Sequence, residues 1–201
     1  MKYLFIDTSN SFINIYIVED SKVLVYKHVE TLREMANTIM PLIRESFNEV
    51  DFDIKDIDKI FVTVGPGSFT GVRVGITVAK TISWSLNIPV YPISTLEYLA
   101  SCDTSYNKII PIIDARRENV FAGFYDNELN SLDREVLIRY DELVKDDSAL
   151  LVSYDGVYDS TISNVNIIKL INKHLSDKDV SAHKLVPNYL KKTEAEEKLN
   201  D

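Results

Sequence analysis

The sequence contains 201 residues, 45% of them hydrophobic, which suits one domain or two small lobes with a packed core and excludes disorder. Its net charge is −9 without any basic cluster that could contact nucleic-acid phosphates, so we expect another subunit to hold any RNA. The single cysteine, Cys102, excludes an internal disulfide, and Asp7 breaks the apolar N-terminal run, which argues against a signal peptide or membrane span. We therefore predict a soluble cytoplasmic protein.

The first part of the chain predicts an antiparallel meander followed by a helix. Strands are expected at Tyr3–Ile6, Ser11–Val18 and Lys22–His28. Thr31 and Glu34 then have the spacing of a capping box, and we expect a kink at Pro41, whose ring clashes with the preceding turn. The apolar positions that recur at helical spacing are Leu32, Met35, Ala36, Ile39 and Ile43.

The remaining elements repeat the order of strands and helices. Further strands are predicted at Ile60–Val64, Val90–Pro92, Ile109–Ile113, Val120–Tyr125, Glu135–Ile138 and Leu150–Ser153. Helices are predicted from about Val72 to Leu86 and at Thr95–Ser101, Asp141–Val144 and Ile167–His174. This repetition predicts two similar lobes, residues 1–103 and 104–188, followed by a charged helical tail at 189–201.

The most distinctive stretch is the glycine loop, Gly65-Pro66-Gly67-Ser68-Phe69-Thr70-Gly71. A strand, a glycine loop and a helix in succession can present backbone amides to an anion at the helix N-terminus. The loop lacks the Gly-Lys-Ser/Thr ending of a P-loop and the glycine spacing of a Rossmann fold. The alternative is a tight connection in which glycines permit close packing, and spacing alone slightly favours it.

Two other strand ends carry polar residues with open interpretations. Asp7-Thr8-Ser9-Asn10 could position Mg²⁺ or a phosphate, or it could simply close a hairpin as an Asx-type turn. Asp114-Ala115-Arg116-Arg117 could bind an anion or carboxylate, or form a solvated hairpin end. The candidate nucleotide or anion contacts are Asp7, Thr8, Ser9, Gly67, Ser68 and Arg116.

No pattern indicates catalysis. His28, His174 and His183 lack the spacing of a zinc-binding pair, so no metal ligand is predicted. Cys102 has no feature of a nucleophile, and Ser68 is not in a nucleophile elbow.

Several motifs together resemble the TsaB family from end to end. They are Phe5-Ile6-Asp7-Thr8-Ser9, the glycine loop continued as Val72-Arg73-Val74-Gly75 with Ala79-Lys80, Ser94-Thr95-Leu96, Asp114-Ala115-Arg116-Arg117 and Pro187-Asn188-Tyr189-Leu190. Four residues depart from the family's usual pattern: Met35, Asn119, Phe121 and Lys191. These departures bear on small-molecule contacts and leave the fold and the glycine loop unaffected.

The resemblance implies a two-lobed actin-like ATPase (ribonuclease H-like) fold and a role in making threonylcarbamoyladenosine next to the anticodon of tRNA. It implies a non-catalytic subunit that activates its larger paralogue TsaD, with the ATPase TsaE joining them. The partners would use ATP and a divalent metal, this chain would have no cofactor of its own, and tRNA would be bound only through the complex.

The second predicted helix carries small residues at every fourth position: Gly71, Gly75, Ala79 and Ser83. Such a strip lets another helix approach closely. With Met35 and Ile39 it is predicted to form the docking face for TsaD, or for a second copy in a homodimer, while Val74, Val78 and Ile82 face the sheet. The alternative is that the first helix covers the strip within the monomer.

A competing function is an actin-fold phosphotransferase with its own ATP site. Such enzymes usually have a glycine beside the first-strand aspartate, whereas Asp7 is followed by Thr8, Ser9 and Asn10. A peptidase is a third hypothesis, but no nucleophile or metal ligands can be assigned for it.

Overall fold

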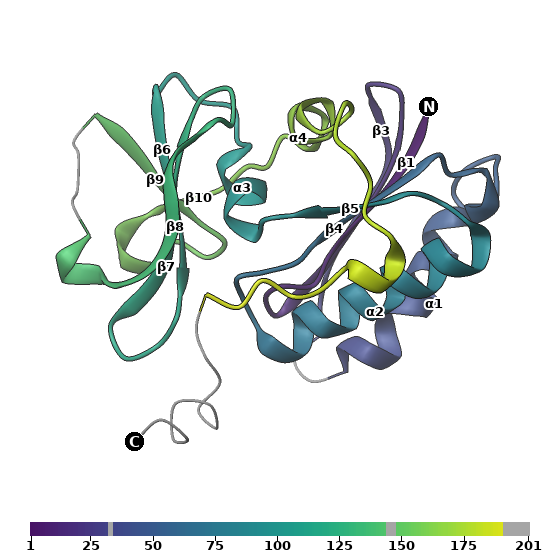
Figure 1. Ribbon diagram of the computed structural model, residues 1–201, viewed down its shortest axis with the longest axis horizontal. Coiled ribbons are helices and arrows are strands. Elements are labelled where there is room, and N and C mark those ends of the chain that lie inside the picture. Colours follow the sequence, from purple (N-terminus) through teal and green to yellow (C-terminus); the bar gives the residue numbers. More distant parts are fainter. Residues whose placement is uncertain (32–33, 144–147, 191–201) are drawn as a thin grey trace.

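The computed structural model describes residues 1–31, 34–143 and 148–190, which form two lobes (Figure 1). Each lobe contains a five-stranded mixed sheet, ordered β3-β2-β1-β4-β5 in the first and β10-β9-β6-β7-β8 in the second. The first sheet consists of β1 (Lys2–Asp7), β2 (Phe12–Glu19), β3 (Lys22–Glu30), β4 (Lys59–Thr63) and β5 (Val90–Ile93). The second consists of β6 (Lys108–Asp114), β7 (Asn119–Asp126), β8 (Ser131–Arg139), β9 (Ala149–Ser153) and β10 (Thr161–Ile162).

The helices divide into two groups. They are α1 (Met35–Phe47), α2 (Phe69–Leu86), α3 (Thr95–Ala100) and α4 (Ile167–Lys173), with 3₁₀ turns at Ile54–Asp56, Tyr140–Glu142, Val157–Asp159 and Ala182–Lys184. Figure 1 shows α1 and α2 together on one side of the first sheet, and α3 between this sheet and the second lobe. The predicted two-lobed α/β architecture is therefore confirmed.

Strand alternation sorts the first sheet into two chemically different faces. Leu4 and Ile6 of β1 pack in the aliphatic core with α1 and α2. Tyr3 and Phe5 point the other way, into a core that includes α3, α4 and the second sheet. Because successive side chains of a strand point to opposite faces, one central strand serves both cores. The two lobes are joined by this shared, aromatic-rich core.

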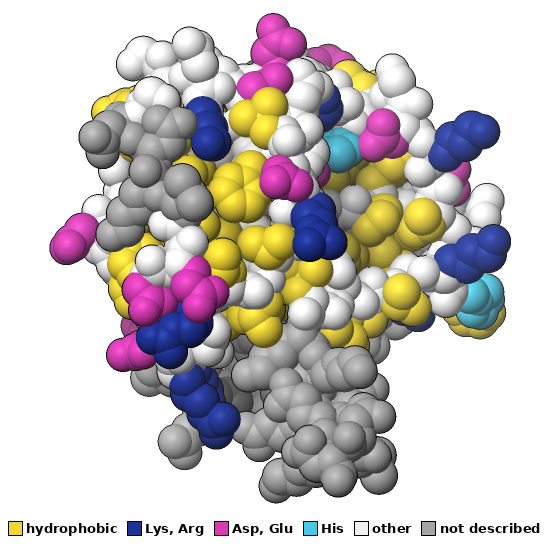
Figure 2. Space-filling model, turned by 60° about the vertical axis from the view of Figure 1, so that its left-hand side comes forward, with side chains coloured by type: hydrophobic (Ala, Val, Ile, Leu, Met, Phe, Trp, Pro, Cys, Tyr) yellow, Lys and Arg dark blue, Asp and Glu magenta, His cyan; other side chains and the backbone are white. Residues whose placement is uncertain are grey.

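The second sheet also has two apolar faces. One packs on α3 and α4, and the other carries a smaller cluster that includes Ile112, Val120 and Leu143. Phe124 and Ile138 lie half-buried at the margin of that smaller cluster. Figure 2 shows hydrophobic side chains gathered on this side of the molecule, with charged residues around them.

The last described segment returns to the first lobe. The Val180 amide donates a 3.0 Å hydrogen bond to the Val90 carbonyl, and Leu185 is buried in the aliphatic core beside α2. The Asn188 amide then donates a 2.7 Å hydrogen bond to the Val64 carbonyl at the end of the first sheet. Chain segments far apart in sequence therefore meet next to the glycine loop.

Some local predictions were wrong in detail. The capping box does not form, because the Glu34 amide donates to the Thr31 carbonyl and the Thr31 hydroxyl donates to the Ser11 carbonyl. The predicted helix at Asp141–Val144 is a 3₁₀ turn at Tyr140–Glu142, and the short strand β10 was not predicted. The helix α1 continues through Pro41 as one element. Leu32, Val144 and the predicted helix beyond Leu190, including Lys191, lie outside the described residues.

Candidate functional site

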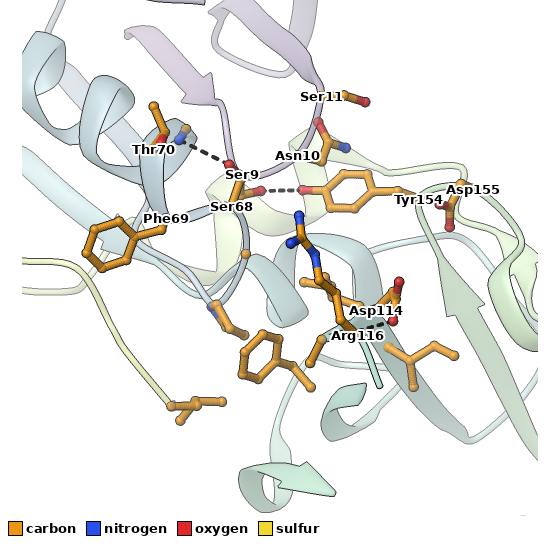
Figure 3. A pocket seen from close by; sticks show the side chains of 18 of the residues that line it. Ser9, Asn10, Ser11, Ser68, Phe69, Thr70, Asp114, Arg116, Tyr154 and Asp155 are labelled. Atoms are coloured by element: carbon orange, nitrogen blue, oxygen red, sulfur yellow. Dashed lines mark hydrogen bonds between the residues drawn. The ribbon is translucent and has the colours of Figure 1, made fainter. Parts of the chain in front are cut away.

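A cleft of about 1150 Å³ opens between the two lobes. Its walls come from the β1–β2 turn, the glycine loop, the β6–β7 hairpin and the returning C-terminal segment (Figure 3). Among the candidate contacts, Ser9, Gly67, Ser68 and Arg116 line this cleft. The structure thus brings together, at one place, residues that lie more than a hundred positions apart in the sequence.

Asp7 lies beneath the cleft as a fully buried carboxylate that accepts five hydrogen bonds. Oδ1 accepts from the Ser9 amide at 3.0 Å, from Ser9 Oγ at 2.5 Å and from Thr63 Oγ1 at 2.7 Å. Oδ2 accepts from Asn14 Nδ2 at 2.9 Å and from the Tyr154 hydroxyl at 3.0 Å. An ionised carboxylate has about four lone-pair positions, so these donors saturate Asp7.

A saturated carboxylate is a poor metal ligand or general base, because its lone pairs are already shared with protein donors. Within the described residues, no group of three histidine, cysteine or acidic side chains could hold a metal ion. Asp7 instead ties the lobes together, since Tyr154 follows β9 of the second lobe. Burial raises the pKa of Tyr154 well above its ordinary value, and the charge of Asp7 raises it further.

The glycine loop packs directly on the β1–β2 turn. A Cβ at Gly67 would overlap the Ser9 carbonyl oxygen, and one at Gly71 would overlap the Thr8 carbonyl oxygen. The Ser68 amide donates a 2.7 Å hydrogen bond to the Ser9 carbonyl, and the Gly71 amide donates to Ser68 Oγ at 3.2 Å. These amides are therefore occupied by protein acceptors, which favours the close-packing interpretation of the loop.

The predicted outward strip of α2 was wrong. Gly71, Gly75, Ala79 and Ser83 are all buried in the monomer, and so is Ile39 of α1, while Met35 is half-buried. Gly71 and Gly75 are small because α2 passes directly over Thr8, where a Cβ would overlap Thr8 atoms. Ala79 lies in the aliphatic core, and Ser83 Oγ donates a 2.7 Å hydrogen bond to the Ile88 carbonyl.

Of the three residues predicted to face the sheet, Ile82 is buried in the aliphatic core, and Val74 and Val78 are half-buried beside it. Small residues at every fourth position do indicate a close approach, but the sequence pattern does not say what approaches. Here the β1–β2 turn and the core take the place of the expected partner helix.

Arg116 reaches the cleft from the β6–β7 hairpin (Figure 3). Its backbone and those of Arg117 and Glu118 have φ of 67°, 54° and 63°, a left-handed conformation that is costly for residues with a Cβ. Asn119 supports this turn, because its Nδ2 donates to the Arg116 and Arg117 carbonyls at 3.3 and 2.9 Å. The departure at Asn119 thus has a structural role in shaping the hairpin.

Sequence reasoning missed the partners of Asp7, namely Asn14, Thr63 and Tyr154. Strand alternation could have indicated two of them. Asn14 lies opposite Asp7 in the β1–β2 register, and Thr63 follows Val62, which pairs with Ile6. Tyr154 comes from the other lobe, and no local pattern marks it.

Comparison with known proteins identifies the family. A family model described as TsaD, tRNA N6-adenosine threonylcarbamoyltransferase, matches residues 29–149. The tRNA threonylcarbamoyladenosine biosynthesis protein TsaB of Bacillus subtilis is 32% identical, over 98% of this chain and 97% of its own length. The chain belongs to the TsaB family. It accordingly takes part in tRNA threonylcarbamoyladenosine biosynthesis.

Solved structures agree with the TsaB assignment at the level of the fold. YeaZ from Pseudomonas aeruginosa is 23% identical with a TM-score of 0.80, over 94% of this chain and 99% of that chain. A second structure from the same organism, described as an uncharacterized protein with similarity to peptidase YeaZ, is 21% identical with a TM-score of 0.81 over the same shares. The solved structures therefore share the two-lobed α/β fold that was expected for this chain. In the described part of the chain, no helix is long and apolar enough to span a membrane.

Proposed function

We propose that this chain is a non-catalytic subunit that activates a TsaD-like partner in threonylcarbamoyladenosine modification next to the tRNA anticodon. The observation that carries the proposal is the saturated carboxylate of Asp7. An actin-fold phosphotransferase would need the polar end of its first strand to face a nucleotide and its metal. Here the Asp7 carboxylate at that end is fully buried and accepts hydrogen bonds from five protein donors.

The docking surface for the partner is proposed to be the outward side of α1 and α2, in place of the buried strip. We define this helical surface by Met40 on α1 and Thr77, Thr81 and Trp84 on α2, all of which are exposed. Met40 is 49% exposed and Trp84 is 72% exposed. Tryptophan is among the residues that most often dominate binding energy in interfaces, and Trp84 is available for such a contact.

The proposal includes the rest of the assembly. A TsaE-like ATPase joins the complex, the partners use ATP and a divalent metal, and tRNA is bound only through the complex. Without a TsaD-like partner, the helical surface pairs with a second copy across a two-fold axis. The net charge of −9 supports the assignment of tRNA binding to a partner, because phosphate contacts need lysine and arginine.

Co-purification with the organism's TsaD-like protein tests the docking surface. Trp84→Glu and Met40→Glu should each abolish the complex and the homodimer while leaving the melting temperature of the chain nearly unchanged, since both side chains are exposed. Ile162→Glu is the matched control, because Ile162 is 63% exposed on the other lobe. Complex formation by both helical variants at wild-type strength would exclude this surface.

A phosphotransferase activity is the alternative function, and nucleotide turnover separates the two. The purified chain should show ATP hydrolysis at background level and no peptidase activity. Robust hydrolysis that Asp7→Ala abolishes would favour the phosphotransferase.

A further inference from the structure

We propose that the interlobe cleft binds a monocarboxylate with an aromatic or apolar body, and that Arg116 anchors the carboxylate. The inference concerns a ligand of this chain itself and does not depend on the scaffold role proposed above. It rests on the presentation of Arg116, on the charges of the cleft walls, and on the apolar surface beside them.

Arg116 is a guanidinium held in place without an acidic partner. Its left-handed backbone is fixed by the Arg116 amide, which donates to Asp114 Oδ1 at 2.9 Å, and by the Asn119 side chain. Among the described residues, the Arg116 side chain makes no ion pair or hydrogen bond, and Figure 3 shows it extending toward Ser9, Asn10 and Tyr154. Strained backbone that directs a side chain into a cleft is commonly associated with ligand binding.

The hairpin also contains a contrasting arginine. Arg117 shares the left-handed backbone but does not line the cleft, and the nearby Arg139 pairs with Glu118 and Asp141 at 3.1 and 3.0 Å. Of these three arginines, Arg116 is therefore the one placed to receive an anion in the cleft. A planar guanidinium can bind a carboxylate through two parallel hydrogen bonds.

The charges of the cleft argue against a polyphosphate. The charged side chains that line its described part are Arg116, Asp114 and Asp155, which sum to a net negative charge. The amides of Ser68 and Gly71 are already bonded within the protein, and Asp7 has no free lone pair for a bridging metal ion. A triphosphate would meet one cation and two carboxylates, whereas a single carboxylate can pair with Arg116 alone.

The rest of the cleft suits a flat or apolar body. Phe69 and Tyr189 stack with centroids 5.0 Å apart at one wall, and both are 42% exposed. The Arg73 guanidinium lies 3.8 Å from the Phe69 ring centre and donates to the Tyr189 hydroxyl at 2.7 Å, which fixes this aromatic pair. Apolar lining is added by Ile113, Phe121 and Leu190.

A ligand of this class is available in the biosynthesis in which the family takes part. Threonylcarbamoyladenosine joins one carboxylate to a purine, so its charge and its aromatic body both match the cleft. The nucleoside is therefore a suitable probe, and adenosine is the matched compound without the carboxylate.

Isothermal titration of the full-length chain tests the assignment. We expect saturable binding of threonylcarbamoyladenosine and of N-acetyl-L-phenylalanine, and weaker binding of adenosine and ATP. Arg116→Gln should weaken the binding of both carboxylate ligands about tenfold or more, because a charge-assisted hydrogen bond is lost. Arg117→Gln is the matched control, because it replaces the neighbouring arginine on the same left-handed backbone, and it should retain wild-type affinity.

Circular dichroism of the two variants keeps the test independent of folding, since equal melting temperatures would assign the difference to binding. Three results would overturn the proposal: no saturable binding of either carboxylate to the wild-type chain, equal affinity in Arg116→Gln, or tighter binding of ATP than of the carboxylates.

Discussion

Tyr154 of the second lobe donates a 3.0 Å hydrogen bond to the carboxylate of Asp7 at the end of the first strand. The same hydroxyl lies 2.8 Å from Ser9 Oγ, which also contacts Asp7. Asp7 and Ser9 are fully or almost fully buried, so this contact joins the lobes out of water. The end of the first strand therefore connects the two lobes, and its carboxylate does not face a nucleotide.

Tyr154→Phe removes one donor from this joint and keeps the ring. We expect the free energy of unfolding to fall by about 1–3 kcal/mol, because a buried charged acceptor loses a partner. Urea denaturation followed by circular dichroism measures the change. Tyr106→Phe is the control, because Tyr106 is 41% exposed and its loss should change stability by less than about 0.5 kcal/mol. Equal stability of the two variants would show that the bond to Asp7 contributes nothing.

Gly75 must lack a side chain because its neighbour is the Thr8 hydroxyl. A Cβ at Gly75 would overlap Thr8 Oγ1, whereas the next atom, Thr8 Cβ, is at an ordinary 3.5 Å. We expect Gly75→Ala to lower the melting temperature clearly, and Thr8→Ala to restore part of that loss in the double variant. A double-mutant cycle measures this coupling.

Gly71 provides the contrast for that cycle. A Cβ there would overlap the Thr8 backbone carbonyl, which no side-chain change removes. Gly71→Ala should therefore stay destabilised when combined with Thr8→Ala. If Thr8→Ala restored both glycine variants equally, the explanation by the Thr8 hydroxyl would fail.

Ala79 lies fully buried in the aliphatic core. Ala79→Leu inserts extra volume into a packed site, so we expect a loss of about 1–3 kcal/mol in unfolding free energy. Thr77→Leu, on the exposed side of the same helix, should change stability little. Thermal denaturation compares the two. An unchanged melting temperature in Ala79→Leu would indicate that the small-residue strip is exposed after all.

His174, which follows α4, contacts Glu97 of α3 and Asp177 of its own segment. Its Nε2 lies 2.9 Å from Glu97 Oε1 and its Nδ1 lies 2.6 Å from Asp177 Oδ2. Burial acts to lower the pKa of His174, but hydrogen bonds and charges from Glu97 and Asp177 outweigh it, and the folded-state pKa is raised above 6.5. The protonated form is therefore favoured by folding.

The stability from His174 is complete below its unfolded pKa and is lost as pH rises through the higher folded pKa. We expect the wild-type chain to lose more unfolding free energy between about pH 6 and pH 8 than His174→Gln does. Chemical denaturation at a series of pH values measures this difference. Parallel pH profiles for the two proteins would contradict a stabilising interaction of protonated His174 with Glu97 and Asp177.

The sequence predicted the order of strands and helices well, because apolar alternation and glycine boundaries are local properties. It could not predict which side of α2 faces inward, since Val74 and Val78 are larger than Gly75 and Ala79, yet the turn at Thr8 occupies the space beside the glycine. The contact between Asp7 and Tyr154 was likewise unpredictable, because it forms only when the two lobes pack together.

The candidate cleft residues show the same division. Ser9, Ser68 and Arg116 were found from motifs at strand and loop ends, and the structure places them around one cleft. The saturation of Asp7 depends on Asn14 and Thr63, which only strand register brings to it.

Product formation in a reconstituted reaction tests the central claim most directly. Threonylcarbamoyladenosine in tRNA would be measured with the TsaD-like protein and the remaining components while this chain is titrated in. We predict that product appears only with the TsaD-like protein present and rises to a plateau as the chain is added, with no product from the chain alone. Formation of the modified nucleoside by this chain without the TsaD-like protein would contradict the assignment of a non-catalytic, activating subunit.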